Sequence, residues 1–203
     1  MDFLSLGQQL ADYMLALDGF RVAPEPTGTY EHMGAVVTDA ILQAGLNYRT
    51  VVTPRVNRVL REYPDARTTS RFLTVLDQNG ASIVLNWRHP EKPRRLYALT
   101  IFLAASGVET EGDLQAWLLI PENCDALLEI KGIGLKTVDY LKNLVNVPTV
   151  AVDRHIRRFI ERAGIQCNQY DEIRSIVVCA ADLLEVPCSN LDHAIWSYST
   201  NSR

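Results

Sequence analysis

Apolar residues recur every three or four positions along most of this 203-residue chain, whereas few segments alternate apolar and polar residues. The first pattern is typical of amphipathic helices and the second of half-buried strands. Cap and breaker residues divide the helical pattern into pieces. Thr53 precedes Pro54 at one expected helix start, and Gly45 and Gly107 follow expected helix ends. The sequence therefore predicts an all-α fold of about ten to eleven helices.

The expected helices cover residues 4–17, 33–44, 53–62, 70–77, 96–105, 112–119, 122–130, 135–145, 153–163, 171–184 and 191–198. Residues 81–87 are ambiguous, because their apolar centre suits a strand or a short buried helix, and we favour the helix. Residues 88–95 contain two prolines and several basic side chains, so we expect a loop there. This loop would either meet phosphates or simply be solvated.

Composition limits the function classes. The net charge of −4 and the pI near 5.6 oppose a simple nucleic-acid binder, so any positive potential must be local. The longest apolar runs, such as residues 99–105, are too short to span a bilayer, and the chain does not start with a basic-then-apolar leader. We therefore expect a cytoplasmic protein without a membrane partner, associated with the nucleoid if it is bacterial or archaeal. The cysteines form no CxxC pair, so no metal site is expected.

A glycine hairpin is the most informative local feature. Lys131, Gly132, Ile133 and Gly134 lie between two apolar helical segments, and two glycines this close permit a tight turn. The first amides of the following helix lack helical partners and carry the positive end of its dipole, so they can bind a DNA phosphate. Leu135 follows Gly134 where a P-loop would have Lys-Thr, which excludes that motif. A hairpin that only packs two helices together stays an alternative.

Lys136 and Asp153 are the candidate catalytic pair. The helix over 135–145 advances about 16 Å, and the seven-residue segment 146–152 can return that far when extended, so the two side chains can meet. Each residue would lie at a helix start, where the dipole disfavours an ammonium and favours a carboxylate. A catalytic amine needs a pKa near about 7 to 8, and burial against Val138 and Val152 would help to lower it. A lysine on a helix is otherwise a solvated surface residue.

The segment 127–159, LLEIKGIGLKTVDYLKNLVNVPTVAVDRHIRRF, resembles the helix-hairpin-helix, Gly/Pro-rich loop, aspartate (HhH-GPD) superfamily of base-excision DNA glycosylases, which includes endonuclease III and the 8-oxoguanine glycosylases. The resemblance rests on the L-x-x-I-x-G-I-G hairpin, the lysine two residues later, the loop containing Pro148 and the V-D-x-H-I-x-R-F motif. It implies two helical subdomains with the active site in the cleft between them. Residues 25–148 would form a six-helix barrel-like subdomain with the helix-hairpin-helix at 122–145, and residues 1–24 and 149–203 the second subdomain.

The resemblance also implies an activity. The substrate would be double-stranded DNA containing a damaged base, bound by a monomer. Lys136 would attack C1′ of a flipped nucleotide, and Asp153 would stabilise the developing charge, which gives glycosylase and AP lyase activity through a Schiff base. The DNA-binding residues would be Lys131, Gly132, Ile133, Gly134, Thr137, Gln43, Asn47, Arg154 and His155. Gln43 and Asn47 fall where relatives fill the gap left by the flipped base.

No cofactor is expected, because Cys179 and Cys188 do not form the four-cysteine cluster that holds iron and sulfur in many endonuclease III relatives. The damaged base stays open: the residues after Asp153 resemble those of compact 8-oxoguanine glycosylases, whereas those after Lys136 resemble endonuclease III, which favours oxidised pyrimidines. Three other functions remain: a monofunctional glycosylase of the same fold, a non-catalytic helix-hairpin-helix DNA-binding protein, and a helical scaffold for protein interactions.

Overall fold

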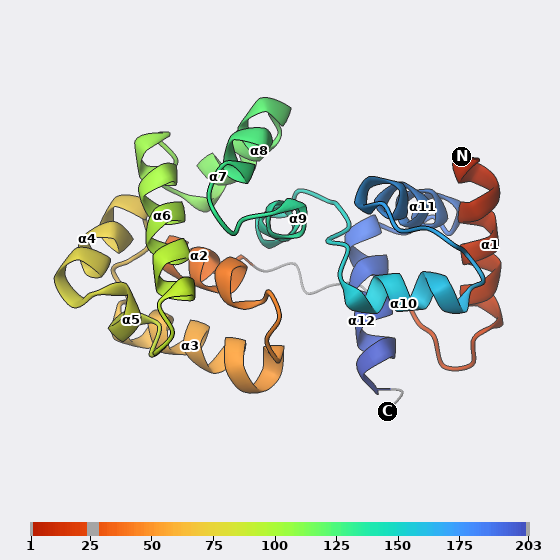
Figure 1. Cartoon of the computed structure of the whole chain (residues 1–203), viewed down its shortest axis with the longest axis horizontal. Helices are drawn as coiled ribbons and strands as arrows, with labels where there is room; N and C mark the ends of the chain where they lie inside the picture. Colours follow the sequence, from red (N-terminus) through yellow and green to blue (C-terminus); the bar gives the residue numbers. More distant parts are fainter. Residues whose placement is uncertain (1, 24–28, 202–203) are drawn as a thin grey trace. The chain divides into compact units, whose positions relative to one another are not determined.

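The computed structural model describes residues 2–23 and 29–201, which form twelve α-helices, one short π-helical segment and no strand (Figure 1). The elements are α1 (Phe3–Ala16), α2 (Met33–Leu42), η1 (Tyr48–Val52), α3 (Thr53–Glu62), α4 (Thr69–Asn79), α5 (Ala81–Val84), α6 (Glu91–Ala105), α7 (Glu111–Leu118), α8 (Pro121–Leu128), α9 (Leu135–Leu144), α10 (Arg154–Arg162), α11 (Tyr170–Leu183) and α12 (Cys188–Asn201). The all-α prediction is confirmed. None of these helices combines the length and the apolar character needed to span a bilayer.

The chain divides into two compact units, each with its own apolar core. The hairpin unit comprises Gly28–Val147, and the termini unit comprises Met1–Thr27 together with Pro148–Arg203. The sequence predicted subdomain boundaries at 24/25 and 148/149, and the units divide at 27/28 and 147/148. The hairpin unit holds more helices than the six that were expected, because η1 and α3 to α9 all follow α2 within it.

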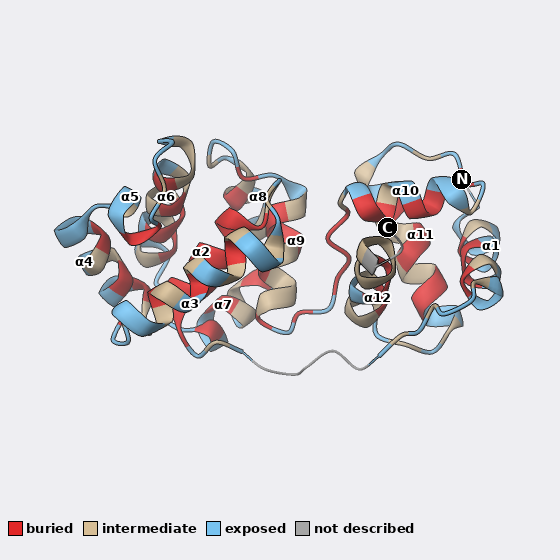
Figure 2. Cartoon of the chain, turned by 90° about the horizontal axis from the view of Figure 1, so that it is seen from below, coloured by how far each residue is buried: buried red, intermediate tan, exposed pale blue. Residues whose placement is uncertain are grey.

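The hairpin unit is built around α2, in which every residue from Met33 to Leu42 is buried (Figure 2). A helix that is apolar on nearly all sides is stable only when other helices cover it. Helices α3, α4, α6 and α9 pack against α2 and provide that cover. The carboxyl end of α2 therefore lies where side chains from several other helices can reach it.

The termini unit is formed by α1, α10, α11 and α12. Helix α1 packs along α11, where Gly7 lies so close to Cys179 that a Cβ atom would come within 2.6 Å of its Sγ. Phe159 of α10 lies fully inside, with its ring 5.4 Å from that of Tyr13. Helices from both ends of the sequence thus share one core.

The main correction to the expected helices concerns the basic segment 88–95, which was expected to be a loop. Helix α6 begins at Glu91 with Pro90 as its N-cap, so most of the segment is helical. Proline is compatible with the first helical turn, where its missing amide would have no helical partner, and Pro93 lies in that turn. Glu91 also forms ion pairs with Arg94 and Arg95, both at 3.2 Å, which bring the basic side chains onto the helix surface.

Smaller differences concern element ends. Residues 81–84 form the short helix α5, so the preference for a helix over a strand is confirmed there. Helix α12 extends beyond the expected 191–198 at both ends, and the π-helical segment η1 was not expected. The predicted helix over 53–62 matches α3 at both ends. Thr53 is not its cap as expected: it is itself helical, because α3 follows η1 directly, and its hydroxyl donates back to the Tyr48 carbonyl at 3.1 Å.

Candidate functional site

The hairpin joins α8 to α9 through a turn that depends on backbone hydrogen bonds. The Ile133 amide donates to the Ile130 carbonyl at 2.9 Å, and the Ile133 side chain is buried. Gly132 has φ +92°, and Gly134 is the N-cap of α9, with no side-chain cap hydrogen bond. The Gly134 carbonyl accepts the Thr137 amide at 2.8 Å, which closes the first turn. The helix therefore starts without a capping side chain over its positive end.

A second reason for glycine at position 132 is its contact with Arg95 of α6. A Cβ atom on Gly132 would overlap Arg95 Nε and would lie 2.5 Å from its Cζ. The left-handed φ alone already disfavours any side chain. The basic segment at the start of α6 thus places a guanidinium directly against the hairpin, although sequence reasoning did not single out this arginine.

Replacing Gly132 by Ala is expected to lower the free energy of unfolding by about 1 to 3 kcal/mol, because of the left-handed backbone and the displacement of Arg95. Gly134→Ala is the matched control. Gly134 has φ −128°, and a Cβ atom added there would meet no other atom within 4 Å, so this variant should lose less than about 1 kcal/mol, the usual loss on replacing a glycine N-cap by alanine. Urea unfolding of both variants measures the difference. Equal losses would contradict the role assigned to position 132.

Lys136 lies in the first turn of α9, and its Nζ donates a hydrogen bond to Gln43 Oε1 at 2.6 Å. Gln43 follows the last residue of α2 and is 8% exposed. One helical turn away, Tyr140 of α9 donates its hydroxyl to Asp39 of α2 at 3.2 Å. The two helices therefore run in opposite directions and share two polar contacts. These contacts fix where the Lys136 amine lies within the hairpin unit.

Asp39 is a fully buried carboxylate that sequence reasoning missed. It accepts hydrogen bonds from Tyr30 at 2.7 Å, Tyr48 at 3.0 Å and Tyr140 at 3.2 Å. Burial raises the pKa of Asp39, and the three hydroxyl donors oppose that shift. A lone acidic residue inside the otherwise apolar helix MGAVVTDAIL is the signal that points to it. This cluster ties η1, α2 and α9 together one turn from Gln43.

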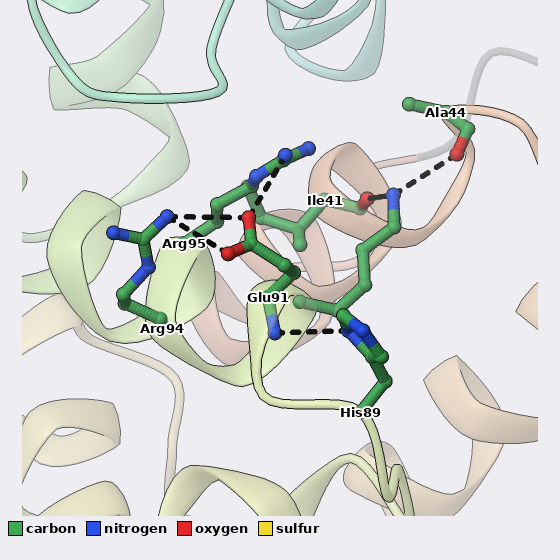
Figure 3. Close-up of polar contacts among 7 residues, drawn as sticks. Ile41, Ala44, His89, Glu91, Arg94 and Arg95 are labelled. Atoms are coloured by element: carbon green, nitrogen blue, oxygen red, sulfur yellow. Dashed lines mark hydrogen bonds and ion pairs between the residues drawn. The ribbon is translucent and has the colours of Figure 1, made fainter.

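Lys92 reaches the same end of α2 from the first turn of α6. Its Nζ donates to the Ile41 carbonyl at 2.6 Å and to the Ala44 carbonyl at 2.9 Å (Figure 3). Burial, followed by the charges of Arg95 and Lys136, lowers the pKa of Lys92 to about 8. The cationic side chains of Lys92, Arg95 and Lys136 therefore lie near the end of α2. They give this acidic chain a local positive region.

Asp153 is the N-cap of α10, as its position in the sequence indicated. Its Oδ1 accepts the amides of His155 at 2.7 Å and Ile156 at 3.1 Å. The preceding loop is anchored within the same unit: the Ala151 amide donates to Asp192 at 2.8 Å. The carboxylate is therefore held in one orientation by backbone donors.

The remaining predicted site residues are distributed over both units. In the hairpin unit Lys131 and Asn47 are exposed, and Thr137 is buried. Asn47 Oδ1 caps η1 by accepting the Thr50 amide at 3.0 Å. In the termini unit Arg154 is exposed and His155 is buried. Their roles in DNA binding stay predictions, as do the gap-filling roles of Gln43 and Asn47.

Lys136 belongs to the hairpin unit and Asp153 to the termini unit. Each side chain is placed by its own helix start, and the meeting of the two groups stays a prediction. Among residues 2–23 and 29–201, no group of three or more histidine, cysteine or acidic side chains could hold a metal ion, and the four cysteines are free thiols.

Comparison with known proteins relates the fold to DNA glycosylases. The H. pylori 3-methyladenine DNA glycosylase MagIII, solved with bound 1,N6-ethenoadenine, matches with a TM-score of 0.59. The match covers 100% of this chain and 99% of that one, at 15% sequence identity. This chain shares its fold. The helix-hairpin-helix formed by α8 and α9 is consistent with that likeness.

Two sequence comparisons cover smaller parts of the chain. An 8-oxoguanine DNA glycosylase/AP lyase from Metallosphaera sedula is 34% identical over 82 residues, which is 37% of this chain and 41% of that protein. The match thus spans about two fifths of the relative's length. Residues 102–200 match a family described as a domain of unknown function, DUF8548. This region contains both Lys136 and Asp153.

Proposed function

We propose that this protein is a base-excision DNA glycosylase with AP lyase activity, which removes a damaged, preferentially oxidised, base from duplex DNA. The observation that carries the proposal is the Lys136 amine, held by Gln43 in the first turn of the helix that follows the glycine hairpin. The fold of a 3-methyladenine glycosylase and the partial likeness to an 8-oxoguanine glycosylase/AP lyase support it. A module that only binds phosphates has no need for this amine.

DNA binding would begin at the hairpin. The first amides of α9 and the exposed Lys131 face an approaching phosphate, with the positive end of the helix dipole behind them. Arg95, packed against Gly132, adds a second charge from α6. This local set of donors would allow a chain with a net charge of −4 to bind a polyanion.

The chemistry would proceed on a flipped nucleotide, because C1′ cannot be reached inside the base stack. The neutral Lys136 amine forms a bond to C1′ while the bond from C1′ to the base breaks, and the base leaves with a proton. Opening of the sugar ring gives a Schiff base between Nζ and C1′. Loss of a proton from C2′ then expels the 3′ phosphate by β-elimination. The Asp153 carboxylate stabilises the positive charge that develops on the sugar.

A panel of duplexes tests the proposal. We expect the protein to release the base from at least one duplex containing 8-oxoguanine, thymine glycol, uracil or ethenoadenine. The damaged strand should break during the reaction itself, without alkali. Binding to all duplexes in a gel-shift assay, with release from none, would refute the enzymatic assignment.

The panel also separates a second candidate, a monofunctional glycosylase for alkylated or etheno purines. The fold likeness to the ethenoadenine-bound glycosylase over the whole chain favours this candidate. Its signature is release of the purine with a strand that breaks only after alkali treatment. That result would retain the glycosylase assignment and remove the lyase step.

A further inference from the structure

The buried Asp39 carboxylate of α2 uses its two oxygens for different parts of the hairpin unit. Its Oδ1 accepts the hydroxyl of Tyr140, in α9, at 3.2 Å. Its Oδ2 accepts the hydroxyl of Tyr30, which precedes α2, at 2.7 Å and that of Tyr48, in η1, at 3.0 Å. In the described part of the chain, no lysine, arginine or histidine side chain is bonded to this carboxylate. The two oxygens therefore connect α9 and η1 to the same residue of α2.

The three bonds explain why a carboxylate occupies position 39. An ionised carboxylate accepts at about four lone-pair positions and donates none, so it can accept three hydroxyls at once. An asparagine amide has one acceptor oxygen, and its N–H donors would replace the second oxygen. An apolar residue would avoid the cost of burying a charge, but it could not accept any of these bonds. The carboxylate thus provides directional links between segments that an apolar core residue cannot provide.

The bond to Tyr48 closes the segment that carries both predicted gap-filling residues. Gln43 follows the last residue of α2 and Asn47 caps η1, so the bond from Tyr48 back to Asp39 fastens the far end of this segment. The Lys92 amine holds the near end through two backbone carbonyls. Asn47 itself is exposed. A loop that is fixed in advance loses less conformational freedom when it binds a ligand.

The bond to Tyr140 fixes the position of α9 along α2. Tyr140 follows Lys136 by four residues on the same helix, so the two side chains project from the same face. A shift of α9 that moved the Lys136 side chain along α2 would also stretch the bond between Tyr140 and Asp39. The helix of the candidate nucleophile is therefore held by the same carboxylate that holds the segment ending at Asn47.

We propose that Asp39 is a positioning residue for base excision: through Tyr48 it sets the gap-filling segment, and through Tyr140 it sets the helix that carries the nucleophile. This inference rests on the proposed function. It gives the two oxygens different tasks, so loss of one hydroxyl should affect DNA binding and loss of the other should affect the chemical step. A core group with only a structural role predicts no such division, because either loss would then lower stability alone.

Two hydroxyl deletions test this division. Replacing Asp39 itself would endanger folding, whereas phenylalanine keeps each ring and removes one bond. Tyr48→Phe should weaken gel-shift binding to a duplex with an uncleavable abasic analogue by about three- to tenfold. Tyr140→Phe should slow borohydride trapping on an abasic duplex, at saturating protein, by about fivefold or more. Each variant should change the other quantity by less than about twofold, since binding and chemistry are measured separately.

Tyr30→Phe is the matched control. It removes a hydroxyl from the same Oδ2, in a segment that carries no predicted site residue. It should change neither the affinity nor the trapping rate by more than about twofold. The inference is overturned if all three variants behave alike, or if Tyr48→Phe and Tyr140→Phe affect the same step.

Hydrogen exchange read by mass spectrometry tests the same links without DNA. Tyr48→Phe should speed amide exchange about threefold or more in peptides covering 43–52, and Tyr140→Phe should do so in peptides covering 134–144. Tyr30→Phe should change neither region. Unchanged exchange in Tyr48→Phe or in Tyr140→Phe would overturn the inference even if DNA is cut. The expected exchange, with no binding or trapping by the original protein, would refute the proposed function and retain the two links.

Discussion

Lys136→Gln is expected to abolish the covalent adduct that borohydride traps between the protein and a damaged duplex, and to slow strand cleavage by at least about 10³-fold. The proposed Schiff base requires a primary amine at this position, and the glutamine amide is not a nucleophile. The replacement keeps a polar end near Gln43, so the contact between α2 and α9 changes little. Denaturing gels of borohydride-treated reactions measure the adduct, and single-turnover assays measure cleavage.

The controls for this prediction separate chemistry from folding. Lys142→Gln removes a lysine from the same helix and should trap the DNA as well as the original protein does. A melting temperature of Lys136→Gln close to that of the original protein would show that the loss is not one of structure. If the adduct persists in Lys136→Gln, another amine is the nucleophile, such as that of Lys92 at the same end of α2. That result would contradict the assignment of Lys136.

Asp153→Asn is expected to reduce single-turnover base release by about 10²- to 10⁴-fold while leaving the fold intact. Asparagine caps a helix about as well as aspartate, so the amides of His155 and Ile156 keep their acceptor and the free energy of unfolding should change by less than about 0.5 kcal/mol. The variant removes only the charge that would stabilise the sugar cation. Release of the base under single-turnover conditions, together with urea unfolding, separates the two effects.

Asp153→Ala is the companion variant. It removes both the charge and the cap, so it should lose about 1 kcal/mol of stability in addition to the activity. If Asp153→Asn releases the base at the original rate, Asp153 acts only as the cap of α10. That result would contradict the proposed role of its carboxylate in stabilising the sugar cation.

Much of the fold follows from local sequence signals. Asp153 is the N-cap of α10, because a cap needs only a side chain and the amides that follow it. Pro54 lies in the first turn of α3, where its missing amide needs no helical partner. The glycine hairpin lies where the sequence indicated, since a left-handed φ at Gly132 is easily adopted only by glycine. The start of α6 was missed because two prolines suggested a loop, although proline is compatible with a first helical turn.

The sequence by itself determined the helical class, the hairpin and the identity of the candidate nucleophile and carboxylate. Only the tertiary structure showed that Gln43 holds Lys136, that three tyrosines surround Asp39, and that Lys92 reaches the end of α2. These contacts join residues 9 to 101 positions apart. Residue spacing sets which side chains share a helix face, whereas the packing of one helix on another decides which faces meet. The protonation state of an amine depends on these contacts between helices, because burial and neighbouring charges act through space.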